Sequence, residues 1–403
     1  MATDSFTPAA KRAILVITAV QFINVVDFMM VMPLGPDFSK ALGIKVSHMG
    51  VLAGAYTLSA AVSGLIGSLF LDRLDRRVAL CWSMVGLVFG TAAGAFATDF
   101  HTLLWARVFA GAFGGPTTSI GLAIISDLVP HERRGTALGR VMMGFSAASL
   151  FGVPIGLEIA RVGGWNAPFL IVGITAAVIG IAAWFALPPM RNHLTKAYDV
   201  RQVLPIRSLL SQAPVRVCYA LFFCVLMSGF LIFPNISAYL QVNSGFPRDD
   251  MGQLYFVGGI ASLFAMNFSG RMVDKMGSVP WFIVGSFGFI TSVFLGMYFE
   301  PALLNPYLLF VTLMVFGTFR NISNHTIASK VPAPHERAGF MSLQSCVQHA
   351  AMSAGGILSS RILSTGADGK LVGMDHVIEL SSVLVIAGIG LMVALSKLVK
   401  SPS

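Results

Sequence analysis

Twelve long apolar segments follow one another along the chain, and they constrain its fold more than any other feature. A helix needs roughly 20 apolar residues to cross the hydrocarbon core of a bilayer. Runs of about that length lie near residues 13–34, 46–70, 78–97, 102–126, 137–160, 166–187, 217–240, 252–272, 280–298, 306–329, 339–361 and 377–396. Charged residues make up only 11% of the chain, against about 25% in soluble proteins. The sequence therefore predicts an all-α membrane protein with twelve transmembrane helices.

The net charge is +9, and the distribution of its lysines and arginines along the chain predicts the orientation of these helices. If the N-terminus is cytoplasmic, only six of the 27 lysines and arginines fall in external loops, and two fall inside spans. Such an excess of positive charge marks the cytoplasmic side. We therefore expect a cell-membrane (inner-membrane) protein with both termini in the cytoplasm, and the basic balance does not indicate a nucleic-acid partner.

Two short elements recur at nearly the same spacing and indicate an internal duplication. The tetrapeptide Pro-His-Glu-Arg occurs at 130–133 and again 204 positions later, in 334–337. The loop segments 68–77 and 270–280 align with an offset of 202 when Asp72 is superposed on Asp274. A polar stretch at 191–216 separates the first six apolar runs from the last six. The chain is predicted to form two six-helix bundles in parallel repeat, at 1–190 and 217–403, joined by a cytoplasmic linker at 191–216.

These repeated loops resemble the G-x-x-x-D-R/K-x-G-R-R/K motif of the major facilitator superfamily. The second copy matches at Gly270, Asp274, Lys275 and Gly277, and the first matches at Asp72, Arg73, Arg76 and Arg77. Ser68 and Asp75 stand in the first copy where the motif has glycines. The resemblance extends over essentially the whole chain. It implies two bundles related by a pseudo-two-fold axis and transport by alternating access.

Two further regions, in the fourth and fifth spans, also resemble motifs of that superfamily. The run LLWARVFAGAFGG is similar to the fourth-span motif, with Arg107 as its arginine and Ala110 where glutamine is frequent. The segments FGVPIG and GGWNAPF are similar to the fifth-span signature of efflux proteins. Arabinose-efflux-type and twelve-span drug:proton antiporters are the members that the chain resembles most.

The resemblance also implies a cytoplasmic gate formed by loop charges. Pro-His-Glu-Arg by itself makes a good helix start, because proline suits the first turn and glutamate complements the helix dipole. Solvated loop charges are the alternative interpretation. The predicted gate residues are Asp72, Arg73, Arg77, Glu132, Arg133, Asp274, Lys275, Glu336 and Arg337.

Ionisable residues inside spans are the candidates for proton coupling, because each is costly in hydrocarbon without a partner or water. Asp27 follows Arg12 by 15 residues, which places it roughly 22 Å from the inner surface. Arg107 lies near the same level on the fourth span. We predict that Asp27 carries the proton and that Arg107 modulates it; a static ion pair is the alternative.

A second polar cluster lies in the last six spans. Arg320 lies roughly 15 Å from the inner surface, and no acidic residue is level with it in this half. Its counter-charge could be Asp27, a neighbouring dipole or an anionic substrate. The predicted substrate-binding residues are Arg320, Asn321, Asn324, Gln348, His349, Asn235, Tyr239, Phe233 and Met30, and ordinary packing is the competing explanation for most of them.

The leading hypothesis is a secondary transporter that exports a small polar or amphipathic organic molecule in exchange for protons. Uptake or facilitated diffusion of an organic anion held by the buried arginines is the alternative. No motif of a hydrolase, metalloprotease or nucleotide-binding enzyme is present in the sequence. The four cysteines lack metal-ligand spacing. We therefore expect no enzyme activity, no cofactor and no metal, and a monomer that interacts with its substrate, protons and the lipid bilayer.

Overall fold

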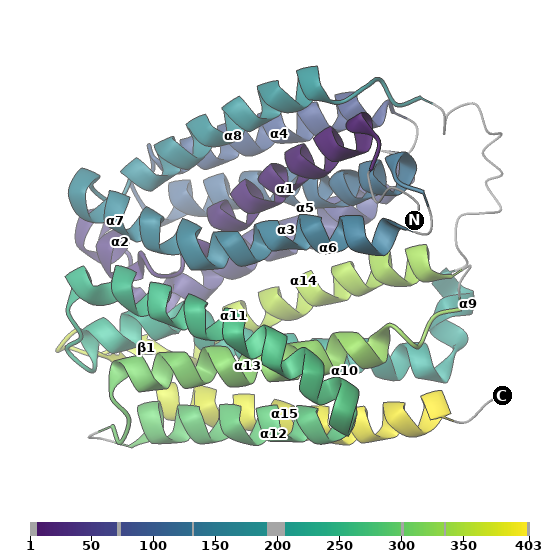
Figure 1. Ribbon diagram of the computed structural model, residues 1–403. Helices are drawn as coiled ribbons and strands as arrows, with labels where there is room; N and C mark the ends of the chain where they lie inside the picture. Colours follow the sequence, from purple (N-terminus) through teal and green to yellow (C-terminus); the bar gives the residue numbers. More distant parts are fainter. Residues whose placement is uncertain are drawn as a thin grey trace. The chain divides into compact units, whose positions relative to one another are not determined.

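The computed structural model describes residues 6–70, 74–130, 133–191, 206–299, 302–333 and 336–400. Long helices cover the predicted spans (Figure 1). They are α1 (Pro8–Met29), α3 (Met49–Phe70), α4 (Arg76–Gly94), α5 (Phe100–Leu128), α6 with α7 (Arg134–Ala147, Val153–Gly163), α8 (Ala167–Ala186), α10 (Ala213–Val242), α11 (Met251–Met276), α12 (Ser278–Val293), α13 (Pro306–Ala328), α14 (Arg337–Ile362) and α15 (Met374–Lys400).

Ten helical segments of the described chain are both long enough and apolar enough to cross a bilayer. The other two long helices, α13 and α14, have 23 and 26 residues but are more polar. Their polar residues include Arg320, Asn321, Asn324, Gln348 and His349. Because all of these belong to the predicted substrate site, the two helices that carry most of that site are also the least hydrophobic.

Local chemistry explains where several helices begin. The Thr7 hydroxyl accepts a hydrogen bond from the Ala10 N–H at the start of α1, and Pro8 occupies the first turn. Asp99 and Thr102 form a reciprocal capping box at the start of α5. Asn305 caps α13 in the same way as Thr7 caps α1. These caps satisfy backbone N–H groups that a helix start otherwise leaves without partners.

The fifth span contains a π-helical turn, η4 (Ala148–Gly152), between α6 and α7. Here the Val153 N–H donates to the carbonyl oxygen of Ala148, five residues earlier. Pro154 follows at once and has no N–H to continue the α-helical ladder. The proline of the efflux-like segment thus coincides with a widened helical turn, a feature that often accompanies function.

Short elements complete the fold: α2 (Gly35–Leu42), the 3₁₀ turns η1 (Val46–His48) and η6 (Arg248–Asp250), α9 (Ile206–Ser211) and the π-helical turn η7 (Phe294–Tyr298). The strands β1 (Ser364–Thr365) and β2 (Leu371–Val372) form a small antiparallel hairpin between α14 and α15. The sequence patterns did not predict this hairpin, because two-residue strands leave no periodic signal. The predicted all-α class is otherwise correct.

The chain divides into two compact units. The first comprises Met1–Val31 and Ala55–Tyr198, and the second comprises Met32–Gly54 and Asp199–Ser403. Within the first, α4 packs on α5 and α8, and α1 packs on α5, α6 and α8. Within the second, α10 packs on α14 and α15, and α13 packs on α11 and α12 (Figure 1). Most of the predicted first bundle lies in the first unit, but its segment 32–54 groups with the second.

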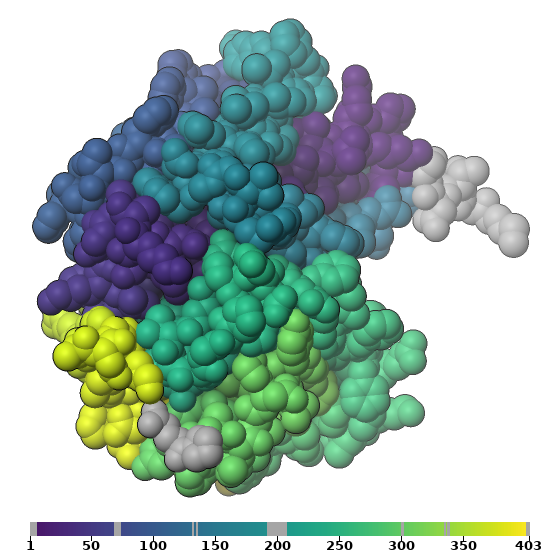
Figure 2. Space-filling model, turned by 90° about the vertical axis from the view of Figure 1, so that its left-hand side faces the viewer, coloured from purple at the N-terminus to yellow at the C-terminus, as the bar shows by residue number. Residues whose placement is uncertain are grey.

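Segment 32–54 is held within the second unit by polar and close backbone contacts. Its helix α2 and turn η1 pack against α10. Figure 2 shows the molecule from this side, where purple surface borders green surface. Arg248 donates to both carboxylate oxygens of Asp37, at 2.9 and 3.1 Å. A Cβ atom added to Gly50 or to Gly356 would collide with the backbone of the other glycine. Two helices therefore approach at a distance that only glycine permits.

Candidate functional site

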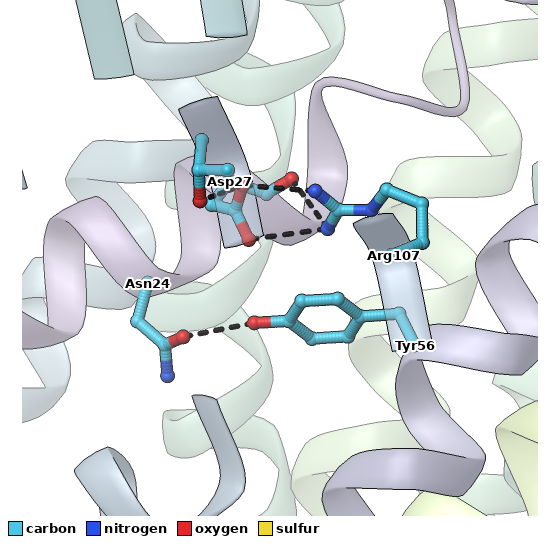
Figure 3. Close-up of polar contacts among 5 residues, drawn as sticks. Asn24, Asp27, Tyr56 and Arg107 are labelled. Carbon is cyan, nitrogen blue, oxygen red and sulfur yellow. Dashed lines mark hydrogen bonds and ion pairs between the residues drawn. The ribbon is translucent and has the colours of Figure 1, made fainter. Parts of the chain in front are cut away.

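The first unit contains a fully buried ion pair between Asp27 of α1 and Arg107 of α5 (Figure 3). Asp27 has 0% and Arg107 has 1% of its surface exposed. The two terminal nitrogens of Arg107 donate to the two carboxylate oxygens of Asp27, at 2.9 and 3.1 Å. A third hydrogen bond, of 3.1 Å, reaches the Asp27 backbone oxygen. Arginine's planar fork suits such two-point pairing, which fixes the geometry as well as the charge.

Two other helices, α3 and α4, and Asn24 of α1 itself add polar groups around this pair. The Thr91 hydroxyl of α4 donates to the Asp27 carboxylate at 2.8 Å. The guanidinium carbon of Arg107 lies 4.5 Å from the ring centre of Tyr56, a cation–π contact. Tyr56 in turn donates its hydroxyl hydrogen to the side-chain oxygen of Asn24, at 2.9 Å (Figure 3). Hydrogen bonds and one cation–π contact thus connect the buried charges to Thr91, Tyr56 and Asn24.

Glycines of α5 make room for this network. A Cβ atom on Gly114 would collide with the Tyr56 hydroxyl and would lie 2.9 Å from the Asn24 side-chain oxygen. A Cβ atom on Gly111 would collide with the Tyr56 backbone. The small-residue run after Arg107 therefore allows α3 to approach α5 closely enough for Tyr56 to cover the guanidinium group.

Chemically, this arrangement ties the position of Arg107 to the charge of Asp27. Protonation of the Asp27 carboxyl would abolish its attraction to Arg107 and would leave the guanidinium group without a counter-charge in a dry interior. Proton uptake at Asp27 therefore requires that Arg107 move or find another acceptor. Any change of protonation at Asp27 would in this way require a rearrangement between α1 and α5.

The second unit contains a different cluster, around Arg320 of α13. This residue is 2% exposed, and no carboxylate of the described chain pairs with it. One terminal nitrogen donates to the Ser228 hydroxyl of α10 at 2.8 Å. The guanidinium carbon lies 4.7 Å from the ring centre of Phe289. Unlike Arg107, Arg320 carries a buried charge that the described residues do not neutralise.

Several other predicted substrate residues are buried within their own unit. Asn235 donates to the Leu231 carbonyl oxygen and the Ser359 hydroxyl. Tyr239 donates to the Met297 carbonyl oxygen at 3.1 Å. Asn324 is fully buried, and Met30, in the first unit, is 1% exposed.

The remaining predicted substrate residues are more accessible. Asn321 is exposed, whereas Phe233, Gln348 and His349 are half-buried. The His349 ring nitrogen Nδ1 lies 2.9 Å from the Ser345 carbonyl oxygen on the preceding turn. Among the nine predicted substrate residues, these four side chains have the most accessible surface.

Comparison with known proteins identifies the family. A model of the Major Facilitator Superfamily matches residues 17–356, which is most of the chain. The chain belongs to this superfamily. It is a multi-pass membrane transporter and not an enzyme.

Two individual relatives share about a quarter of the aligned residues with this chain. An uncharacterized MFS-type transporter of Bacillus subtilis, YbcL, is 26% identical over 62% of each chain. A protein of Helicobacter pylori J99 named "Probable sugar efflux transporter" is 26% identical over 68% of each chain. The crystal structure of a D-xylose–proton symporter superposes with a TM-score of 0.76 at 16% identity, covering 95% of this chain and 97% of that one. This last likeness concerns the fold alone. The match spans about three fifths of the length of the B. subtilis relative.

The nine predicted residues of the cytoplasmic gate lie only partly within the described residues. Asp72, Arg73, Glu132 and the side chain of Arg337 lie outside the described residues. Asp274 and Lys275 are exposed at the end of α11, and Arg133 precedes α6. Glu336 accepts a hydrogen bond from the Gln212 side chain at 2.9 Å. Arg77 lies over the Trp184 ring, 4.6 Å from its centre, inside the first unit. The gate role of all nine stays a prediction.

Asp75 has a structural role that the motif comparison did not assign. Its carboxylate accepts hydrogen bonds from the backbone N–H groups of Arg77 and Met190 and from the Arg191 side chain. Burial alone would raise the pKa of this carboxyl, but the hydrogen bonds outweigh it and hold the pKa below its ordinary value. Asp75 therefore caps α4 and ties it to the chain that follows α8. The departure from the motif glycine marked this position, but its partners could not be read from the sequence.

Other residues of the buried network were also not predicted from the sequence. Asn24 precedes Asp27 by one helical turn, so the spacing offered a signal for it. Tyr56 and Thr91 are single polar residues in apolar spans, and nothing in their spacing links them to Asp27. Only the packing of α3 and α4 against α1 and α5 reveals their part in the site.

Proposed function

We propose that this transporter exports a small, polar, sugar-like molecule in exchange for protons, with Asp27 as the proton carrier and Arg107 as its modulator. The observation that carries the proposal is the fully buried, two-point ion pair between these residues. A buried pair is weak evidence for stability, since apolar residues of similar volume often serve equally well. A carboxylate retained in such a place is better explained by a functional role.

The surrounding groups support reversible protonation. Thr91 and the two terminal nitrogens of Arg107 all donate to the ionised carboxylate. Because a hydroxyl can also turn to accept, Thr91 can serve a protonated carboxyl as well. Tyr56 offers Arg107 a ring face that does not depend on the charge of Asp27. The network therefore has partners for both protonation states.

Two of the four accessible predicted side chains are neutral amides, which supports a hydroxyl-rich substrate. Asn321 is exposed and Gln348 is half-buried, and amides both donate and accept hydrogen bonds. The relative from H. pylori whose name includes sugar efflux agrees with this substrate class. Arg107 is neutralised by Asp27 and Arg320 is only 2% exposed, which disfavours the alternative of organic-anion uptake.

We further propose a monomer in the cell membrane with both termini in the cytoplasm. The distribution of lysine and arginine supports that orientation. Reactive-cysteine labelling of tags at the two termini in intact cells and in inverted vesicles tests it.

Transport in proteoliposomes tests the coupling. With the lumen more acidic than the medium, the outward flow of protons should drive accumulation of a labelled sugar. Asp27→Asn should abolish the accumulation while leaving exchange of labelled for unlabelled sugar intact, because exchange needs no net proton movement. Asp249→Asn makes the same chemical change at an exposed carboxylate of η6 and serves as the matched control.

Two results would overturn the proposal. If Asp27→Asn still accumulates sugar in response to the pH gradient, then Asp27 is not the proton carrier. If the wild-type protein exchanges organic anions but no sugar under any gradient, then the substrate class is wrong. A thermal-shift screen across sugars and organic anions at two pH values identifies which compounds to test first.

A further inference from the structure

We infer that the Arg320 cluster of the second unit is a binding site for a small inorganic anion, of which chloride is the type. This site is formed by the contacts of Arg320 and does not depend on proton coupling at Asp27. The described residues give Arg320 no carboxylate as a counter-charge. A guanidinium group that is 2% exposed in a membrane protein carries a large desolvation penalty unless an opposite charge compensates it.

The unsatisfied polar atoms around Arg320 are mostly hydrogen-bond donors. The buried side-chain atoms without a partner in the described residues include Arg320 Nε, Ser286 Oγ and Asn324 Nδ2. Each of these atoms carries hydrogen. Asn324 Oδ1 is the one unpartnered acceptor of this group. Buried polar atoms are nearly always satisfied, so several together indicate something that the protein atoms do not supply.

These donors lie along one helix contact. Asn324 follows Arg320 by four residues and therefore lies on the same face of α13. A Cβ atom on Gly285 would lie 3.0 Å from the backbone nitrogen of Arg320, so this part of α12 touches α13. Ser286 comes next, and Phe289, three residues further on, stacks on the guanidinium group. Ser286 and Phe289 thus share the face of α12 that meets Arg320.

The positive charge of Arg320 and the burial of the surrounding donors determine which ligand fits the site. A cation is repelled by the guanidinium group, and a water molecule would satisfy donors without neutralising the charge. A monovalent anion does both, and it accepts hydrogen bonds from N–H and O–H groups alike. The low exposure of Arg320, Ser286 and Asn324 leaves no route for a large organic anion without opening the bundle. The site therefore suits a monatomic ion or one of similar size.

The thermal unfolding of the purified full-length protein tests this inference. Sodium chloride, bromide, formate and gluconate are compared at constant ionic strength, so that general screening is equal. Chloride and bromide should raise Tm saturably, by about 2 to 4 °C over gluconate. Formate probes whether a carboxylate, such as one on an organic substrate, occupies the site instead.

Three variants separate anion binding from structural damage. Ser286→Ala removes a hydroxyl that has no partner among the described residues, so Tm in gluconate should not fall, whereas the apparent chloride affinity should drop about tenfold. Ser292→Ala on the same helix removes a hydroxyl that donates to the Gly288 carbonyl oxygen, and it should leave the chloride response unchanged. Arg320→Met should be insensitive to chloride and at least as stable as the wild type in gluconate.

The inference fails if wild-type Tm is equal in chloride, bromide and gluconate, or if formate alone stabilises the protein. It also fails if Ser286→Ala responds to chloride like the wild type. Crystals grown in bromide should show an anomalous peak within hydrogen-bond distance of Arg320 Nε and Ser286 Oγ. A bromide peak that is absent there would contradict the assignment.

Discussion

Replacing Asp27 and Arg107 singly and together measures how strongly the buried pair is coupled. In Asp27→Leu, Arg107 loses both carboxylate contacts and remains a charge with 1% exposure. Removing one partner of such a pair destabilises a protein by about 3–5 kcal/mol. Three hydrogen bonds link the two residues, so we expect a value in the upper part of that range.

The double variant Asp27→Leu with Arg107→Met should be more stable than Asp27→Leu alone. It removes both charges together and puts apolar side chains in their place, a change that is often neutral or stabilising. The Tyr56 ring, which lies over the guanidinium group, can pack against the methionine thioether. The interaction energy of the cycle should therefore be at least about 2 kcal/mol.

The assay is equilibrium unfolding in mixed micelles, followed by tryptophan fluorescence. The exposed pair between Glu158 and Arg161 provides the matched control, with side chains 56% and 42% exposed. Its cycle should give an interaction energy of about 1 kcal/mol or less. If the losses of the two single variants at Asp27 and Arg107 simply add, the pair is not coupled, and the reasoning from burial is refuted.

Three other perturbations test the structure more broadly. Asp75→Ala should lower the free energy of unfolding by about 1 kcal/mol or more, because it removes the cap of α4. The pKa of Asp75 is lowered in the folded protein, so the stabilisation by its carboxylate is present above the ordinary carboxyl pKa and is lost as pH falls through the lowered value. The Tm of Asp75→Ala should therefore vary less with pH over that acidic range than the Tm of the wild type. A variant whose Tm depends on pH as the wild type's does would contradict this. Gly285→Ala should destabilise by about 1–3 kcal/mol, since its Cβ would lie 3.0 Å from backbone of α13, whereas Gly317→Ala meets nothing within 4 Å and should be near neutral in the same unfolding assay. The pKa of Asp37 is raised, because burial outweighs the opposing effect of the Arg248 charge. Arg248→Gln removes that charge and should raise the pKa of Asp37 further. A raised carboxyl pKa favours the folded state at low pH. The Tm of Arg248→Gln should therefore fall more than the wild-type Tm as pH rises through the pKa of Asp37 in the folded protein. Equal dependence of Tm on pH in the two proteins would argue against burial as the cause.

The location of the helices and the candidate ion pair followed from the sequence by itself. Twelve apolar runs predict twelve spans because a bilayer demands a fixed length and leaves no water for unpaired backbone groups. Asp27 and Arg107 were predictable at the same depth because helical rise converts sequence distance into depth. The motif repeats pointed to the superfamily, which the family comparison then showed.

The partners of those residues were decided only by the tertiary structure. In a membrane helix nearly every face is apolar, so hydrophobic periodicity does not say which face meets which neighbour. Thr91 and Tyr56 join Asp27 and Arg107 through packing that no local pattern encodes. The same holds for Arg320, whose depth was evident from the sequence. Its lack of a carboxylate among the described residues emerged only when α10, α12 and α13 were packed around it, because a counter-charge is a property of contacts and not of composition.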